Sequence, residues 1–264
     1  MINQSFKKIL DTSLQLTPQI SVITPAYNAS HYISKAIESV QAQTFLYWEM
    51  IVVDDSSTDG TCEIVEKYAV MDSRIKLIRQ TENGGPAKAR NVALSVASSR
   101  YVAFLDCDDM WLPEKLAHQL LFMVERKIAF SYTLYRQFSD EPNYISGLVS
   151  LPISFNYNGL LKNTGIACLT VMIDTELTGP IRMESVRHED YVLWLKLLKN
   201  QFIAYGLMED LARYRISKTS VSGNKFKSAT WVWKVYRDIE RLNFLYAFWC
   251  LLNYGWRAYR KHRS

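Results

Sequence analysis

The stretch Tyr101-Val-Ala-Phe-Leu-Asp-Cys-Asp-Asp-Met-Trp-Leu112 joins an apolar run to three closely spaced carboxylates. Its first part, residues 101–105, is typical of a short buried strand. Asp106, Asp108 and Asp109 come next, and their like charges repel unless they protonate, point into water or share a cation. Oxygen ligands of this kind suit Mn²⁺ or Mg²⁺. The alternative is a solvated loop in which Asp109 caps the next helix.

Strands and helices alternate upstream of this stretch, which predicts an α/β fold with a mostly parallel sheet. In such a sheet, ligands bind beyond the carboxyl ends of the strands. The hydrophobic spacing predicts the first helix from Ser30, with Ser30 as its cap. The expected strands cover residues 20–24, 49–53 and 75–78, and the expected helices cover residues 30–40, 60–69 and 86–97.

Polar side chains follow three of these strands. Tyr27 and Asn28 follow the first strand, Asp54 and Asp55 the second, and the quoted carboxylates the central one. Parallel geometry brings all three ends to one edge. Neither GxGxxG nor GxxxxGK[ST] is present, so we expect a nucleotide bound at its base and ribose, with its diphosphate held through a metal. Asp54 or Asp55 would accept from a pyrimidine N3–H or a ribose hydroxyl; the alternative is that they cap the following turn.

Arg90 and Asn91 lie on the helix that follows the loop Asn83-Gly84-Gly85-Pro86. Proline suits the first position of that helix. From this position the Arg90 side chain could face the ribose or the diphosphate. Solvation at the surface is the alternative for Arg90.

The downstream half contains a second cluster of titratable residues, His188-Glu189-Asp190, at the start of a strongly apolar helix. Carboxylates at this position are stabilised by the helix dipole, which is one interpretation. The other is that Asp190 is a general base that takes the proton of an acceptor hydroxyl, with Glu189 and His188 supporting it or orienting the acceptor. We expect strands over residues 128–138 and 168–173, with loops over residues 139–165.

Composition and charge limit the class of protein. Nearly half of the 264 residues are apolar, which is enough for one large domain and excludes general disorder. The four cysteines show no disulfide or metal spacing, which with the absence of a signal peptide predicts a cytoplasmic setting. Residues 223–264 carry nine Lys and Arg against two acids, so the rest of the chain has a net charge of about −2. This asymmetry argues against a general nucleic-acid surface.

The tail, residues 223–264, is rich in aromatic residues, and its apolar core, residues 242–252, is too short to span a bilayer. Aromatic residues beside Arg257, Arg260 and Lys261 are typical of a helix lying on an anionic membrane surface. The alternative is a helix packed on the catalytic domain or on a second subunit. We therefore expect a domain over residues 1–222 and a peripheral membrane tail. Within the domain, residues 18–112 would bind the nucleotide and residues 113–222 the acceptor.

With these residues in place, the chain resembles family 2 of the glycosyltransferases, which are inverting enzymes with a GT-A fold. The resemblance covers about residues 18–222, and the tail lies outside it. Its motifs are Ser21-Val-Ile-Thr-Pro-Ala-Tyr-Asn28, Gln43-Thr44, Val52-Val-Asp-Asp-Ser-Ser-Thr-Asp-Gly60, Asn83-Gly-Gly85 with Ala89-Arg-Asn91, Phe104-Leu-Asp-Cys-Asp-Asp109, and Glu189-Asp190. Ser56 stands where a glycine is commoner.

The resemblance implies a role for each matching residue. Pro25 and Tyr27 would line the uridine pocket. Asp55 would contact the uracil with Asp54 beside it, Asp106 would lie near the ribose, and Asp108 would hold the metal. Asp190 matches the catalytic base, and Asp109 is a supporting carboxylate. A looser match places Tyr214 and Arg215, with Ser220 and Ser222, over the diphosphate.

The resemblance also implies a substrate class. It is closest to bacterial enzymes that build O-antigen, capsule or teichuronic-acid repeat units. These imply a UDP-sugar donor, with glucose or galactose expected, and an N-acetylhexosamine acceptor on diphospho-undecaprenol. The Gln-x-x-Arg-Trp motif of processive synthases is absent, so one sugar per encounter is expected, and the resemblance implies that it is β-linked. Two alternatives are a nucleotidyltransferase on a related sheet and a non-catalytic, membrane-docked module that binds nucleotide sugars.

Overall fold

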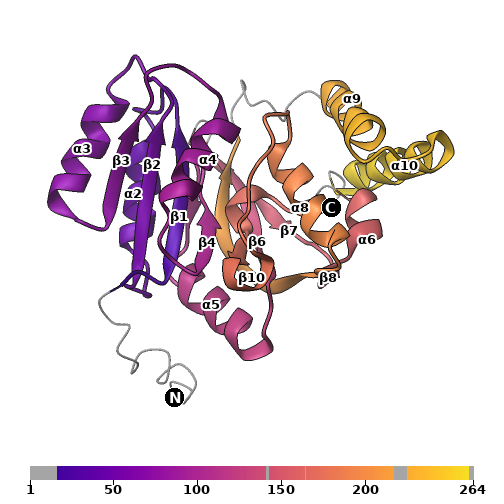
Figure 1. Cartoon of the computed structure of the whole chain (residues 1–264), viewed down its shortest axis with the longest axis horizontal. Coiled ribbons are helices and arrows are strands. Elements are labelled where there is room, and N and C mark those ends of the chain that lie inside the picture. Colours follow the sequence, from indigo (N-terminus) through magenta and orange to yellow (C-terminus); the bar gives the residue numbers. More distant parts are fainter. Residues whose placement is uncertain (1–16, 141–142, 164, 217–224, 262–264) are drawn as a thin grey trace.

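Four parallel strands form the amino-terminal half of the central sheet (Figure 1). The computed structural model describes residues 17–140, 143–163, 165–216 and 225–261. The four strands lie in the order β3-β2-β1-β4, so the chain changes direction across the sheet between β1 and β4. Ligands of open α/β sheets bind at such a switch point. The strands are β1 (Ile20–Ala26), β2 (Trp48–Asp54), β3 (Ile75–Arg79) and β4 (Tyr101–Phe104).

The second half of the sheet mixes parallel and antiparallel pairs. Strand β9 (Met172–Asp174) lies between β4 and β6 (Phe130–Ser139) and is antiparallel to both. Strand β6 is parallel to β10 (Ala204–Arg215). Two antiparallel steps restore the strand direction, so β4, β6 and β10 end at the same edge as β1 and β2. The ten-stranded sheet is completed by β5 (Met110–Trp111), β7 (Tyr144–Val149) and β8 (Ser154–Phe155), each an antiparallel partner.

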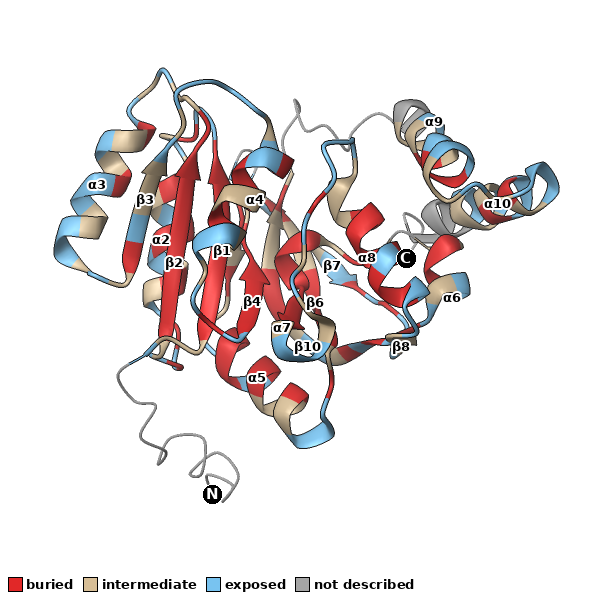
Figure 2. Ribbon diagram, in the orientation of Figure 1, coloured by how far each residue is buried: buried red, intermediate tan, exposed pale blue. Residues whose placement is uncertain are grey.

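Helices cover both faces of the sheet. Successive side chains of a strand point to opposite faces, so the apolar strands place hydrophobic side chains on both faces, and each face is buried under helices. Ile23 and Val53 belong to a core on one face, and Val22 and Val52 to a core on the other. Figure 2 shows strands β1, β2 and β4 as buried along their whole length. The first face is covered by α4 (Pro86–Val96), α6 (Tyr157–Leu161) and α8 (Glu189–Lys199), and the second by α2 (Ile33–Gln41), α3 (Thr61–Met71) and α5 (Lys115–Arg126).

Three local predictions were wrong. Residues 139–165, expected as loops, contain β7, β8 and α6. The predicted strand over residues 168–173 begins as a 3-10 helix, Cys168–Thr170, and only then enters β9 before α7 (Thr175–Thr178). The first helix begins at Ile33 rather than Ser30. The Ser30 amide instead donates to Asp59, in a turn fixed by a distant part of the chain.

The carboxyl-terminal helices pack on the α/β domain beside α6 and α8 (Figure 1). They are α9 (Lys225–Lys234), the π-helix η3 (Val235–Ile239) and α10 (Phe244–Lys261). The Tyr236 hydroxyl donates to the Leu161 carbonyl, and the Tyr157 hydroxyl donates to Glu240 at 2.5 Å. The expected domain boundary at residue 222 lies outside the described residues. One face of the tail is therefore core, as the packed alternative required.

A buried lysine, Lys115, gives the first testable prediction. Its side chain is fully buried, its ammonium has no hydrogen-bond partner among the residues that the structure describes, and it lies 3.7 Å from the centre of the Trp111 ring. Burial lowers the pKa of Lys115 well below its usual range. Burial therefore disfavours the charged lysine in the folded chain relative to the unfolded chain, and folding loses stability at neutral pH. Lys115→Met should raise the free energy of unfolding by about 1–3 kcal/mol in urea denaturation.

The pH dependence of this gain in stability gives a second check. The charge-related part of the gain from Lys115→Met should shrink as the pH rises towards about 10 and vanish above it, because the lysine is then neutral in the unfolded chain as well. Lys67→Met on α3 is the matched control, since Lys67 is exposed, and it should leave stability nearly unchanged. A loss of stability in Lys115→Met would contradict the prediction.

Candidate active site

The loop after β4 orients its three carboxylates differently. Asp109 is buried, and its Oδ1 accepts the backbone N–H of Arg215 at 2.7 Å. Asp106 and Asp108 remain partly exposed at the strand edge. Burial and the charge of Asp106 raise the pKa of Asp108 to about 6, and burial raises the pKa of Asp109 well above its usual range. Asp109 is thus held inward by β10 and does not cap the following helix, whereas Asp106 and Asp108 face the open edge.

Arg90 connects this loop to the second cluster of acids. Its guanidinium lies 2.5 Å from Asp106 Oδ1 and 2.5 Å from Glu189 Oε1. The Arg90 side chain is only 6% exposed, so the alternative of a solvated surface arginine was wrong. Asp106 and Glu189 are far apart in sequence, and this one side chain brings the end of β4 and the start of α8 together.

The start of α8 presents Asp190 at the same edge. His188 precedes the helix in the left-handed region, with φ of +61°, and the Asp190 carboxylate accepts the N–H of Tyr191 at 2.7 Å. Burial, and next the charge of Glu189, raise the pKa of Asp190 to about 6. Burial lowers the pKa of His188. A carboxylate with a raised pKa beside other acids has the properties of a general base.

The two carboxylates at the carboxyl end of β2 have local partners. Asp55 accepts the N–H groups of Gly84 at 2.8 Å and Gly85 at 2.7 Å, and the Gln80 amide at 2.8 Å. Asp54 accepts the N–H of Ser57 at 3.0 Å, as a turn cap does. Asp55 therefore organises the glycine loop that leads into α4, and Gly85 has the positive φ, +83°, that such a loop requires.

The residues after Asp55 and at the end of β1 complete this edge. Ser56 has φ of +64°, which explains why glycine is the commoner residue there. Pro25 is buried in β1 beyond the point where pairing with β4 ends at Ile23, so its missing N–H costs no ladder bond. Tyr27 follows and is 51% exposed, so its ring is available for stacking.

The residues fit a divalent cation shared with a ligand rather than a complete protein cage. In the part of the chain that the structure describes, no group of three or more His, Cys, Asp or Glu side chains could hold a metal. Among the described residues, the Asp108 side chain makes no hydrogen bond or ion pair with another residue, and burial together with the adjacent negative charge of Asp106 raises its pKa. Mg²⁺ commonly binds through one or two carboxylates plus phosphate oxygens and water.

A comparison with protein families decides the assignment. The model for "Glycosyl transferase family 2" matches residues 21–173, which is more than half of the chain. The chain belongs to glycosyl transferase family 2. It is an inverting glycosyltransferase, as the resemblance implied, and the matched residues include the switch point of the sheet and the carboxylates after β4.

Relatives match almost the whole chain. A protein named for teichuronic acid biosynthesis, the glycosyltransferase TuaG of Bacillus subtilis (strain 168), is 49% identical over 92% of this chain and 97% of its own. The UDP-Glc:alpha-D-GlcNAc-diphosphoundecaprenol beta-1,3-glucosyltransferase WfgD of Escherichia coli is 43% identical over 92% of this chain and 94% of its own. The similarity to these relatives thus extends beyond residues 21–173, which the family model matches.

Solved structures confirm the GT-A fold. The S. aureus TarS fragment in complex with UDP-GlcNAc has a TM-score of 0.68 at 26% identity, covering 84% of this chain and 65% of that one. The chain therefore spans less than two thirds of that TarS fragment. The mannosyltransferase PcManGT of Pyrobaculum calidifontis, solved with GDP-Man and Mn²⁺, has a TM-score of 0.66 at 19% identity, covering 91% of this chain and 71% of that one. The second likeness concerns the fold alone.

Arg215, which only the looser part of the resemblance included, contacts the carboxylate loop after β4. Its Nε donates to the Asp108 carbonyl at 2.6 Å, and its guanidinium packs on the rings of Tyr32 and Phe138. It also pairs with Asp140. Arg215 thus braces the carboxylate loop from β10. Ser220 and Ser222, which the looser match included, lie outside the described residues.

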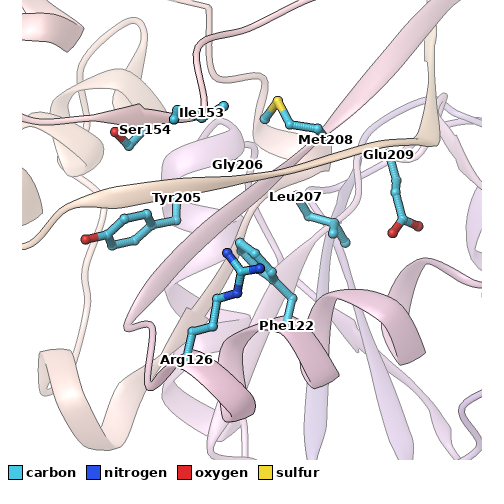
Figure 3. A pocket seen from close by; sticks show the side chains of 9 residues that line it. All are labelled: Phe122, Arg126, Ile153, Ser154, Tyr205, Gly206, Leu207, Met208 and Glu209. Carbon is cyan, nitrogen blue, oxygen red and sulfur yellow. The ribbon is translucent and has the colours of Figure 1, made fainter. Parts of the chain in front are cut away.

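A cavity of about 510 Å³ lies away from this edge (Figure 3). It is lined by the early part of β10, including Tyr205 and Met208, and by Phe122 and Arg126 of α5. Because β10 ends at the carboxylate edge, the amino-terminal part of the same strand lies toward the opposite edge. The cavity is therefore separate from the candidate active site.

Proposed function

We propose that this chain transfers a single hexose, glucose or galactose, from a UDP-sugar to an N-acetylhexosamine carried on undecaprenyl diphosphate. The observation that carries the proposal is the Arg90 bridge, which joins Asp106 of the loop after β4 to Glu189, the neighbour of Asp190 at the start of α8. The acceptor class comes from WfgD, which is similar over nearly the whole chain. The product would carry a new β-linkage.

The chain's own residues divide the chemistry between two sides of the sugar. Asp190 takes the proton of the acceptor hydroxyl as it attacks the anomeric carbon, and an inverting route needs one base on that face. Asp55 and Tyr27 position the uracil, Pro25 lines its pocket beside Asp54, and Asp106 lies toward the ribose. Asp108 would hold Mn²⁺ or Mg²⁺, which stabilises charge on the leaving diphosphate when it is bound.

A panel of UDP-sugars tests the proposal directly. Each sugar is incubated with the protein, Mn²⁺ and a short-chain lipid diphosphate of N-acetylhexosamine, and the glycolipid product is analysed by mass spectrometry and NMR. We expect one added hexose in β-linkage with UDP-glucose or UDP-galactose, and none in the presence of chelator. Absence of product with every donor would overturn the proposal.

The two alternatives have different outcomes in the same assay. Membership of glycosyl transferase family 2 argues against a nucleotidyltransferase, which would release diphosphate from a nucleoside triphosphate. A non-catalytic module would bind UDP-sugars without hydrolysing or transferring them. If the wild type releases UDP from a UDP-sugar and a variant without Asp190 does not, the non-catalytic module is excluded.

The pH dependence of turnover follows from the base. Asp190 has a pKa of about 6 and acts only when deprotonated, so kcat should fall about tenfold per pH unit once the pH is below that value. Asp108 titrates in the same range, and its contribution should appear in the KM for the donor. A kcat that stays level from neutral pH to well below 6, with the protein still folded, would contradict the assignment.

We also propose that the tail docks peripherally on an anionic membrane surface, at the inner face where the lipid-linked acceptor is exposed. Within the described residues, no helix has the length and apolar character needed to cross a bilayer. Helix α10 carries six exposed apolar or aromatic residues, and no acid occurs after Glu240. These six are Phe244, Leu245, Phe248, Trp249, Leu252 and Trp256.

Substitution of these exposed residues provides the test, because deleting residues 242–264 would also remove buried Ala247 and Cys250 from the core. Trp249→Ser combined with Leu252→Ser should lower binding to vesicles containing anionic lipid by at least about tenfold, since each buried side chain contributes about 1.5–3 kcal/mol. Val70→Ser on α3 is the control, because Val70 is exposed and distant from the tail. Unchanged sedimentation of the double variant with vesicles would refute the membrane surface.

A further inference from the structure

Two cations converge on one aromatic ring beside the candidate base. The Arg187 guanidinium lies 5.5 Å from the centre of the Trp231 ring, and the Lys234 ammonium lies 4.5 Å from it. Arg187 belongs to the loop before α8, whereas Trp231 and Lys234 belong to α9. The ring attracts each cation, but the two like charges repel each other.

Neither cation is neutralised by a carboxylate of the described chain. Arg187 and Lys234 are both exposed and have no ion pair there. By contrast, Arg90 and Lys199 of the neighbouring elements each pair with acids. An unneutralised pair of cations held over a tryptophan is a favourable site for an anion of more than one charge.

The position of this pair relates it to the acceptor. Arg187 is three residues before Asp190, so it lies at the end of α8 where the base is presented. Helix α9 leads through η3 to α10, whose outward face carries the exposed apolar residues named above. A sugar, a diphosphate and a polyprenyl chain follow one another in a lipid-linked acceptor. The base on α8, Lys234 on α9 and the apolar face on α10 follow one another in the same order along the chain, and Figure 1 shows α9 and α10 beside α8.

We propose that Arg187 and Lys234, arranged around Trp231, bind the diphosphate of the lipid-linked acceptor. This inference rests on the proposed function and adds a subsite to it. The donor diphosphate is assigned to the Asp108 side of the site, so the two diphosphates have separate partners. Arg187 and Lys234 touch the acceptor outside its reacting sugar, and their contribution should appear mainly in the KM for the acceptor.

The test compares two acceptors with the same N-acetylhexosamine, one linked to a lipid diphosphate and one an alkyl glycoside without phosphate. Arg187→Gln and Lys234→Gln should each raise the KM for the diphosphate acceptor about tenfold, the loss expected for one charge-assisted hydrogen bond. The KM for the UDP-sugar and the rate with the alkyl glycoside should stay at wild-type values. Lys234→Arg, which keeps the charge, should remain close to the wild type.

Two further measurements separate the possible failures. Lys196→Gln removes an exposed cation from α8 and should leave both acceptors unaffected. Binding of farnesyl diphosphate, measured by calorimetry with UDP and chelator present, should weaken at least tenfold in the Arg187→Gln, Lys234→Gln double variant. Equal affinity in this double variant and the wild type, or equal losses with both acceptors, would overturn the subsite while transfer itself still stood. A wild type that transfers to neither acceptor would instead overturn the proposed function.

Discussion

Asp190→Asn is expected to lower kcat by about a hundred- to ten-thousandfold, the contribution of a positioned general base. The amide has nearly the shape of the carboxylate and can still accept the N–H of Tyr191, but it cannot take a proton from the acceptor hydroxyl. UDP binding should be nearly unchanged, because the nucleotide is assigned to the β1, β2 and β4 ends. Steady-state kinetics and calorimetric titration with UDP measure the two quantities.

Glu184→Gln is the matched control for this substitution. Glu184 is exposed on the segment that leads to α8, so the same chemical change there should leave kcat close to the wild-type value. If Asp190→Asn kept near-normal turnover while remaining folded, Asp190 would not be the base. A parallel loss of UDP affinity would show that the residue supports the nucleotide site.

Arg90→Met is expected to lower the free energy of unfolding by about 3–5 kcal/mol, the usual cost of removing one partner from a buried ion pair. Methionine occupies a similar volume, but it leaves Asp106 and Glu189 close together without the guanidinium that separates their charges. Turnover should also fall, because the loop after β4 and the start of α8 are no longer held together. Urea denaturation and kcat provide the measurements.

Removing the opposing charge as well should recover part of this stability. In the Arg90→Met, Glu189→Gln double variant, Asp106 no longer faces a second carboxylate. The double variant should therefore lose less unfolding free energy than the two single variants lose in sum. Arg90→Lys keeps the charge without the two-pronged geometry, and its stability should lie between those of wild type and Arg90→Met. A loss below about 1 kcal/mol in Arg90→Met would show that the bridge contributes little.

The parallel half of the fold was predictable because its signals are local. Apolar runs that end in polar residues predicted β1, β2 and β4, and Pro86 after the glycine loop predicted the start of α4. The region from residue 139 to 174 was predicted poorly, because its strands are short and its order depends on pairing with β6, β10 and β4. Ser30, which looked like a cap, bonds instead with Asp59, a contact that spacing within the helix cannot reveal.

The sequence by itself determined the α/β class, the family and the chemical identity of the carboxylates, because these depend on residue type and short-range order. Only the tertiary structure decided how those carboxylates are used. Asp109 faces Arg215, Asp55 holds Gly84 and Gly85, and Arg90 joins Asp106 to Glu189. Such pairs form between residues tens of positions apart, and their partners are selected by strand order and burial, which no local pattern records.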